Sequence, residues 1–248
     1  MKNMLFAALF CLLAQPWAAA QDYQREKRWA DEILPAVVVG DAVQIRAASG
    51  REFLALYNVA KGSRTAVVLA HGVGVHPDHG VIGQLRDKLA ELGYTTLSIQ
   101  MPVQSKEASV DDYYPKVFPD AADRIAQAAD WLRARGHADV VLLSHSMGAW
   151  MANEYLDRAH GSTPYKAWIV LGLTGGFSWT MRSYALPVLD IYGEHDVPPS
   201  LGAAGRRKLA LNTANGSRQV VVAGADHQYA GRENELARVV DAFLRDRK

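Results

Sequence analysis

The segment Ser144-His145-Ser146-Met147-Gly148 places a serine between a strand-like apolar run and a helix-like run. A serine hydroxyl at such a tight strand-to-helix turn can act as a nucleophile, because the strained turn holds it above the sheet. The residues two positions before and after it must be small, and Gly148 meets this requirement. Ser144 stands where glycine is usual on the other side. Ser146 is therefore the candidate nucleophile.

A second Ser-x-Gly sequence begins at Ser200 and has a different setting. It follows Pro198 and Pro199 instead of an apolar run, and we predict that Ser200 caps the next helix. At ordinary residue frequencies, a chain of this length contains about one Ser-x-Gly by chance. The assignment of Ser146 therefore depends on its position between strand and helix.

A nucleophilic serine needs an acid and a base, and two later strand-like runs end in suitable residues. The run Val188–Tyr192 leads into a turn that contains Asp196, our candidate for the acid. Glu194 in the same turn and Asp190 within the strand are the alternatives. The run Gln219–Val222 leads into a loop that contains His227, the candidate base.

Backbone donors for a negative oxygen are expected after the strand Ala66–Ala70, which runs into His71-Gly72-Val73-Gly74. The N–H of Val73 and the N–H of Met147 could together bind the oxyanion of a tetrahedral intermediate. His71 and Gly72 would then contact the substrate.

Strand-like and helix-like runs alternate through most of the chain. These strands and helices must bring the candidate catalytic residues together. The predicted strands are Ala66–Ala70, Tyr94–Ile99, Val140–Leu143, Ala167–Leu171, Val188–Tyr192 and Gln219–Val222. The predicted helices are Asp22–Leu34, Gly80–Glu91, Asp120–Arg135, Met147–Arg158, Leu201–Leu211 and Glu233–Arg245. Several strands are apolar on both faces, which is typical of parallel strands covered by helices. We predict a doubly wound, mostly parallel α/β sheet, preceded by an antiparallel hairpin of Val43–Ala48 and Glu52–Val59.

Two long segments, Met101–Pro119 and Thr174–Ala185, show no clear periodicity and are interpreted as connections at the carboxyl ends of strands. Ligands of open α/β sheets bind at those ends. The aromatic side chains in these segments are candidates for lining a substrate pocket, or equally for packing in the core: Tyr113, Tyr114, Phe118, Phe177 and Trp179.

The first 20 residues resemble a secretory signal peptide. Lys2 precedes the apolar run LFAALFCLLA, and Ala18-Ala19-Ala20 offers a small-residue cleavage site. We predict cleavage after Ala20, a periplasmic or secreted location, no stable membrane insertion afterwards, and a single domain over residues 21–248. The sole cysteine, Cys11, lies in the removed segment, so the mature chain would contain no disulfide.

The overall composition limits the partners. With 27 basic and 26 acidic residues the formal charge is +1. The chain therefore lacks the excess of basic residues that would indicate binding to nucleic acid. His71, His76 and His79 lie near Asp78, but their spacing matches no zinc pattern. We therefore expect no metal or organic cofactor.

Taken together, HGVG, SHSMG, YGEHDVP and GADHQYAG in this order resemble the α/β-hydrolase superfamily from about Ala66 onward. HPDHGVIGQLRDKLAELGYTTLSIQMP and DDYYPKVFPDAADRIAQAADWL are similar to a little-studied family of exported bacterial α/β-hydrolase-like proteins of unknown function. The resemblance implies a serine hydrolase. Its triad would be Ser146, Asp196 and His227. The sequence departs from the family pattern in showing no clear inserted cap domain, so we expect no large cap.

The expected partner is a small-molecule acyl substrate, most simply an ester. Two other functions fit the same residues: a catalytically inactive binding protein that keeps the fold, and an amidase or peptidase that uses the same triad. Ser144 is the departure from the family pattern that leaves room for the inactive alternative.

Overall fold

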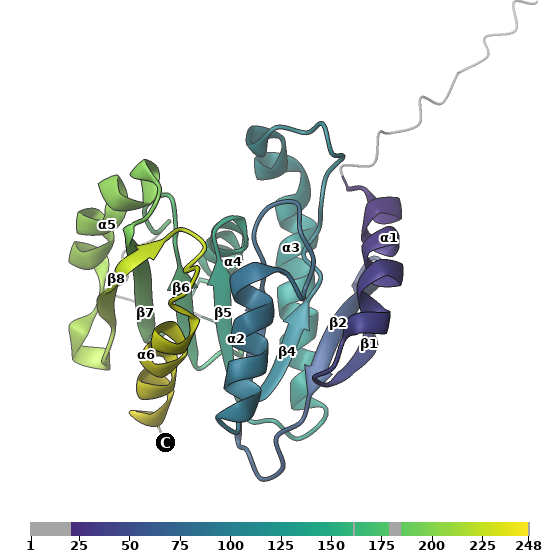
Figure 1. The fold of residues 1–248 in the computed structure, drawn as a ribbon, viewed down its shortest axis with the longest axis horizontal. Coiled ribbons are helices and arrows are strands. Elements are labelled where there is room, and N and C mark those ends of the chain that lie inside the picture. The colour runs from purple at the N-terminus through teal and green to yellow at the C-terminus, as the bar shows by residue number, and fades with distance from the viewer. Residues whose placement is uncertain (1–20, 161, 179–184, 248) are drawn as a thin grey trace, which may run out of the picture.

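A computed structural model describes residues 21–160, 162–178 and 185–247, with the side chains of 112–115 excepted (Figure 1). The predicted signal peptide and Trp179 lie outside the described residues.

The strands form one eight-stranded sheet with the order β1-β2-β4-β3-β5-β6-β7-β8. Their bounds are β1 (Asp41–Arg46), β2 (Glu52–Asn58), β3 (Thr65–Ala70), β4 (Thr95–Ile99), β5 (Asp139–His145), β6 (Ala167–Leu171), β7 (Val188–His195) and β8 (Arg218–Asp226). The pairs β1/β2 and β2/β4 are antiparallel, and all others are parallel. The predicted mostly parallel sheet with an N-terminal antiparallel hairpin is therefore confirmed.

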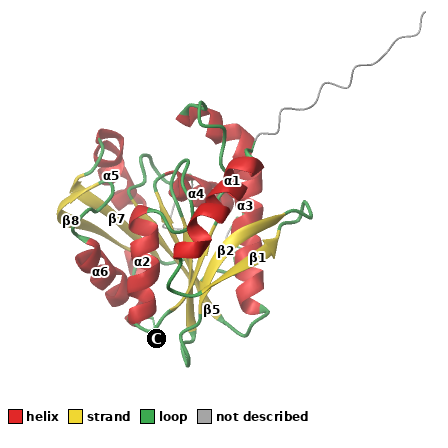
Figure 2. Cartoon of the chain, turned by 45° about the vertical axis from the view of Figure 1, so that its right-hand side comes forward, coloured by secondary structure: helices red, strands yellow, loops and turns green. Residues whose placement is uncertain are grey.

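Helices cover both faces of this sheet (Figure 2). Their bounds are α1 (Tyr23–Ile33), α2 (Gly80–Glu91), α3 (Val110–Arg133), α4 (Met147–Arg158), α5 (Pro198–Ala210) and α6 (Glu233–Arg245). Successive strand residues point to opposite faces, so Val68 packs in a core with α3 and α4, whereas Val67 packs in a second core with α2 and α6. This two-sided burial explains why the strands are apolar throughout.

One predicted connection is wrong, because α3 begins at Val110 and not near Asp120. The prolines at 115 and 119 suggested a loop, since each lacks an N–H and costs about 3 kcal/mol inside a helix. Val117 and Phe118 are buried in the core that α3 shares with the sheet, and this packing favours the helix in spite of the prolines. Phe118 is thus a core residue and not a pocket residue.

A buried ion pair joins α5 to the sheet beside the site. Arg207 Nε lies 3.1 and 2.9 Å from the two carboxylate oxygens of Asp190 on β7, and both side chains are fully buried. Arg207 also donates to the carbonyl oxygens of Leu173, Gly175 and Ser200. Burial raises the pKa of Asp190, although Arg207 opposes that rise.

We expect Arg207→Met to lower the free energy of unfolding by about 3–5 kcal/mol, because it leaves a buried carboxylate without its positively charged partner. Urea denaturation followed by circular dichroism measures this loss. Adding Asp190→Asn should recover part of it. Lys27→Met, which breaks the exposed pair with Asp31, is the control and should cost at most about 1 kcal/mol. A loss of similar size in Arg207→Met and in Lys27→Met would contradict this account.

Candidate active site

Ser146 lies at the turn between β5 and α4 with a strained backbone, φ 54° and ψ −118°. A non-glycine residue in such a region costs about 1–3 kcal/mol, which the surrounding structure must supply. The Ser146 N–H donates to the carbonyl oxygen of Leu171 at 3.0 Å, which fixes the turn to the neighbouring strand β6. The serine side chain is thereby held above the carboxyl edge of the sheet.

Gly148 is required because α4 passes very close to the end of β3. A Cβ atom at this position would lie 2.6 Å from the carbonyl oxygen of Ala70, and nearer still to that of His71. No side chain fits there without moving the backbone. Glycine at this position therefore lets the helix begin directly after the nucleophile.

Ser144, the departure from the expected pattern, has a specific partner. Its hydroxyl is buried and accepts a hydrogen bond of 2.8 Å from the indole Nε1 of Trp168 on β6. A buried indole N–H without an acceptor costs about 1–3 kcal/mol. The hydroxyl at 144 thus satisfies a core tryptophan, and its presence does not disturb the turn.

The second Ser-x-Gly differs from the prediction in detail. Ser200 lies inside α5, whose N-cap residue is Val197. The Ser200 hydroxyl is buried and has no hydrogen-bond partner among the described residues. Ser200 is therefore a helix residue near the start of α5 and not its cap.

Three side chains that are far apart in sequence form a continuous chain of hydrogen bonds. His227 Nε2 lies 2.9 Å from Ser146 Oγ, and His227 Nδ1 lies 2.6 Å from Asp196 Oδ1. Ser146 follows β5, Asp196 follows β7 and His227 follows β8. Because these strands are parallel, their carboxyl ends meet at one edge of the sheet.

Asp196 is held as a charged acceptor. Besides His227, it accepts hydrogen bonds from the backbone N–H groups of Val197 and Gly193, at 2.8 and 3.2 Å. Burial raises the pKa of Asp196, but these hydrogen bonds and the nearby imidazole outweigh it and hold the pKa below its usual value of 3.8. A charged carboxylate beside Nδ1 keeps the proton on that nitrogen, so Nε2 is free to accept one from Ser146.

The two alternative acids have other partners. Glu194 Oε2 accepts a hydrogen bond of 2.8 Å from the Gly224 N–H, and Asp190 pairs with Arg207. Of these three carboxylates, the structure brings only Asp196 to His227.

Gly172 also positions the imidazole, a role that the sequence analysis did not predict. It follows β6 with φ 57°, and a Cβ atom there would lie 2.9 Å from His227 Cε1. Any side chain would therefore displace the ring. The only signal in the sequence is a glycine directly after a predicted strand.

The two backbone donors expected for an oxyanion both border Ser146. Met147 is the first residue of α4, where backbone N–H groups have no acceptor within the helix. Gly72 passes so close that a Cβ atom on it would lie 3.4 Å from Ser146 Cβ. Val73 follows it and lines the same cavity as Ser146.

The prediction that His71 contacts substrate is wrong, because its ring is buried and both nitrogens are used. The Met101 N–H donates to His71 Nε2 at 2.9 Å, so Nδ1 carries the proton and donates to the Gly72 carbonyl oxygen at 2.9 Å. Burial lowers the pKa of His71 to about 3. This neutral ring therefore supports the loop from below, and Gly72 itself borders Ser146.

His145 makes a second link of this kind. Its ring is buried, and Nε2 donates to the backbone carbonyl oxygen of His227 at 2.9 Å. Burial and the neighbouring His227 lower the pKa of His145 to about 4, so the ring is neutral near pH 7. The residue before the nucleophile thus holds the loop that carries the base.

Helix α1 supports the loop that contains Val73, a role that the sequence did not indicate. The Arg25 guanidinium donates to the carbonyl oxygen of Gly74 at 3.2 Å and to that of Gln104 at 2.9 Å. Glu26 forms a buried ion pair of 3.0 Å with Arg124 on α3. The first helix therefore ties together the loops that follow β3 and β4.

Phe177, one of the aromatic residues expected in the pocket, packs against the core instead. Phe177 packs against Trp168, with ring centroids 5.5 Å apart, at the margin of the core. Tyr113 and Tyr114 lie in α3, but their side chains are outside the described part, as is all of Trp179.

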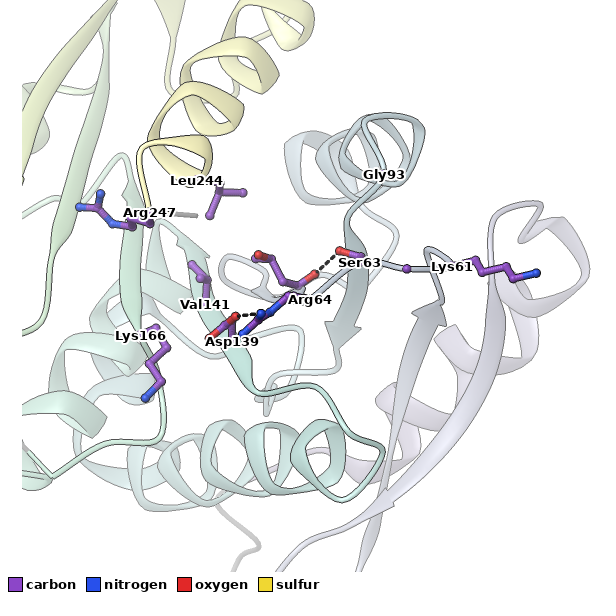
Figure 3. A pocket seen from close by; sticks show the side chains of 11 residues that line it. Lys61, Ser63, Arg64, Gly93, Asp139, Val141, Lys166, Leu244 and Arg247 are labelled. Carbon is purple, nitrogen blue, oxygen red and sulfur yellow. Dashed lines mark hydrogen bonds and ion pairs between the residues drawn. The ribbon is translucent and has the colours of Figure 1, made fainter.

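Two cavities are relevant to ligand binding. One of about 120 Å³ borders Ser146. A larger one of about 640 Å³ lies at the opposite, amino end of the parallel strands, where Arg64 pairs with Asp139 at 3.6 Å (Figure 3). Open α/β sheets bind ligands at the carboxyl ends of their strands, so we assign the site to the smaller cavity.

His76 and His79, with ring centroids 5.4 Å apart, lie in the loop before α2 and at its start. Within residues 21–160, 162–178 and 185–247, no cluster of three or more His, Cys, Asp or Glu side chains is arranged to hold a metal ion. None of the helices in this same part of the chain has the length and apolar character needed to cross a bilayer.

Comparison with known proteins supports the fold. A family model described as an alpha/beta hydrolase domain matches residues 63–174, and one described as a protein of unknown function (DUF3530) matches residues 4–118. No curated protein matches the chain.

Many solved structures are similar. Est1E from Butyrivibrio proteoclasticus is 17% identical, with 83% of this chain and 98% of that chain covered and a TM-score of 0.62. Dienelactone hydrolase from Anabaena variabilis is 20% identical, with 83% and 96% covered and a TM-score of 0.64. A serine hydrolase without lid from Xanthomonas campestris is 16% identical, with 85% and 95% covered and a TM-score of 0.62.

We expect the buried ring of His71 to make stability depend on pH. Its pKa of about 3 in the folded chain lies below the ordinary 6.5. Between these values the unfolded chain binds more protons, so stability falls on acidification by about 1.4 kcal/mol per pH unit. Urea denaturation at several pH values should show a shallower slope for His71→Gln than for wild type. His160→Asn, which changes an exposed histidine, should keep the wild-type slope, and equal slopes in all three proteins would contradict this account.

Proposed function

We propose that this chain, which has the α/β-hydrolase fold and matches the model of an alpha/beta hydrolase domain over residues 63–174, is a serine hydrolase that cleaves an ester or a related acyl bond through an acyl-enzyme. The observation that carries the proposal is the unbroken hydrogen-bonded chain from Asp196 through His227 to Ser146. That chain joins a carboxylate, an imidazole and a hydroxyl in the order that activates the hydroxyl for attack.

In the first half of the reaction, Ser146 Oγ attacks the carbonyl carbon of the substrate. His227 Nε2, 2.9 Å away, takes the hydroxyl proton as the new bond forms. The imidazolium that results is stabilised by the Asp196 carboxylate. When the tetrahedral intermediate collapses, the bond to the leaving group breaks and His227 returns the proton to it, which leaves an acyl-enzyme.

The negative charge of the intermediate requires donors that are in place beforehand. In this proposal the backbone N–H groups of Val73 and Met147 bind the oxyanion. Removal of one such donor typically lowers kcat by about 10²–10³-fold. The contacts of Arg25 with Gly74 and of His71 with Gly72 keep this loop in position.

The second half of the reaction repeats the first with water as the nucleophile. His227 takes a proton from water, the resulting hydroxide attacks the acyl carbon, and the bond to Ser146 Oγ breaks. The proton then returns to the serine oxygen, so the enzyme regains its starting state and the acid product is released.

We expect Ser146→Ala to abolish both hydrolysis of short p-nitrophenyl esters and labelling by a fluorophosphonate probe. The loss of kcat should be on the order of 10⁴-fold or more, since the nucleophile is absent. Ser200→Ala is the matched control, because it removes a buried hydroxyl that has no partner among the described residues. The Ser200→Ala variant should be labelled by the probe and should hydrolyse the esters as wild type does.

Other outcomes would favour the alternatives. A folded wild-type protein that neither binds the probe nor cleaves any ester or matched amide would support a non-catalytic binding role. Faster cleavage of amides than of matched esters would indicate an amidase.

We also propose that the chain is exported and processed after Ala20. The support is the charged start, the apolar run and the Ala18-Ala19-Ala20 site. Expressed in full in a Gram-negative host, the protein should accumulate outside the cytoplasm and begin at Gln21 by N-terminal sequencing. Changing Ala18 and Ala20 to phenylalanine should block cleavage. Unprocessed wild-type protein in the cytoplasm would refute the proposal.

A further inference from the structure

The cavity beside Ser146 is small, and aliphatic side chains form much of its lining. Its volume is about 120 Å³. It is lined by Gly72, Val73, Val75, His79, Val81, Ile82, His145, Ser146 and Gln228. It therefore joins the nucleophile to the loop after β3 and the first turn of α2.

The volume limits what can enter. Pockets for drug-sized ligands measure roughly 300–1,000 Å³, and an engineered cavity of about 150 Å³ holds benzene. At about 120 Å³ the cavity is somewhat smaller than the one that holds the six carbon atoms of benzene. This volume favours a short chain over a long or branched one.

The chemistry of the walls limits the ligand further. Four side chains are aliphatic, and those of Val81 and Ile82 form a buried floor at 3% and 1% exposure. The polar His79 and Gln228 are exposed, so they lie toward the solvent. No Lys, Arg, Asp or Glu of the described residues lines this cavity. A carboxylate would lose part of its hydration there, and no Lys or Arg in the described part of the chain lines the cavity to offset that cost.

The reaction indicates which part of the substrate would occupy this space. The leaving group must face His227 Nε2 to be protonated, and it must have a path out. The acyl group instead stays bonded to Ser146 through both halves of the reaction. Val73 borders both the cavity and the expected oxyanion position, and His227 does not line the cavity. We therefore place the acyl group, and not the leaving group, in this cavity.

We propose that this cavity is an acyl-binding pocket that selects a short, neutral, unbranched acyl group of two to four carbons. This inference rests on the serine hydrolase function proposed above. It makes Val75, Val81 and Ile82 the side chains that set the acyl length, with Val75 the most open to change because it is only partly buried.

The test compares p-nitrophenyl acetate, butyrate, hexanoate and octanoate, which share one leaving group. Each methylene that a pocket cannot accept costs about 10-fold or more in kcat/KM. We expect kcat/KM for butyrate to exceed that for octanoate by at least about 10-fold. The hemisuccinate ester, which matches butyrate in length but carries a carboxylate, should also react at least about 10-fold more slowly than butyrate.

Val75→Ala tests the wall directly, since it removes two methyl groups and leaves room for about two more methylenes. The ratio of kcat/KM for hexanoate to that for butyrate should rise about 10-fold. Val59→Ala is the matched control: it makes the same chemical change at a residue that is 58% exposed and outside the cavity. Its ratio should stay at the wild-type value.

The outcomes separate the two proposals. If wild type is labelled by a fluorophosphonate but cleaves all chain lengths at similar rates, or prefers octanoate, the pocket assignment fails and the serine hydrolase function stands. An unchanged ratio in folded Val75→Ala likewise overturns the assignment. If wild type is neither labelled nor active on any ester, both proposals fail. The wild-type series decides the matter even if Val75→Ala does not fold.

Discussion

The close approach of α4 to the end of β3 is the constraint on which the site depends. Because Gly148 has no side chain, the helix can begin against the carbonyl oxygens of Ala70 and His71. The turn before it then holds Ser146 in a backbone conformation that a non-glycine residue rarely adopts. The loop after β3 therefore lies directly beside the nucleophile. This contact places the proposed oxyanion donors next to Ser146 and forms one wall of the small cavity.

The loops around Ser146 are held by polar groups buried beneath them, and two of these groups are neutral histidines. His71 fixes the loop after β3 to Met101, and His145 fixes the loop after β8 to the nucleophile turn. A neutral imidazole can donate at one nitrogen and accept at the other, so it can join two backbone segments without burying a charge. Arg25 on α1 adds a third connection, to Gly74 and Gln104.

This arrangement explains why an apparent departure in the sequence does not weaken the site. Ser144 stands where glycine is expected, and its hydroxyl accepts a hydrogen bond from the buried indole of Trp168 on the neighbouring strand. The turn still has small residues, Ser144 and Gly148, two positions before and two positions after the nucleophile. The hydroxyl at 144 therefore belongs to the packing between β5 and β6, and the hydrogen bonds of Ser146 are unaffected.

The sequence by itself determined the order of strands and helices, the parallel sheet and the strand ends at which Ser146, Asp196 and His227 lie, because these follow from local apolar periodicity and from turn residues. It did not determine the helical start of α3, where burial of Val117 and Phe118 overrides two prolines. Nor could it distinguish a substrate contact from a buried support at His71, or find Arg25 and Gly172. Those roles depend on which atoms meet across distant segments, and only the tertiary structure decides that.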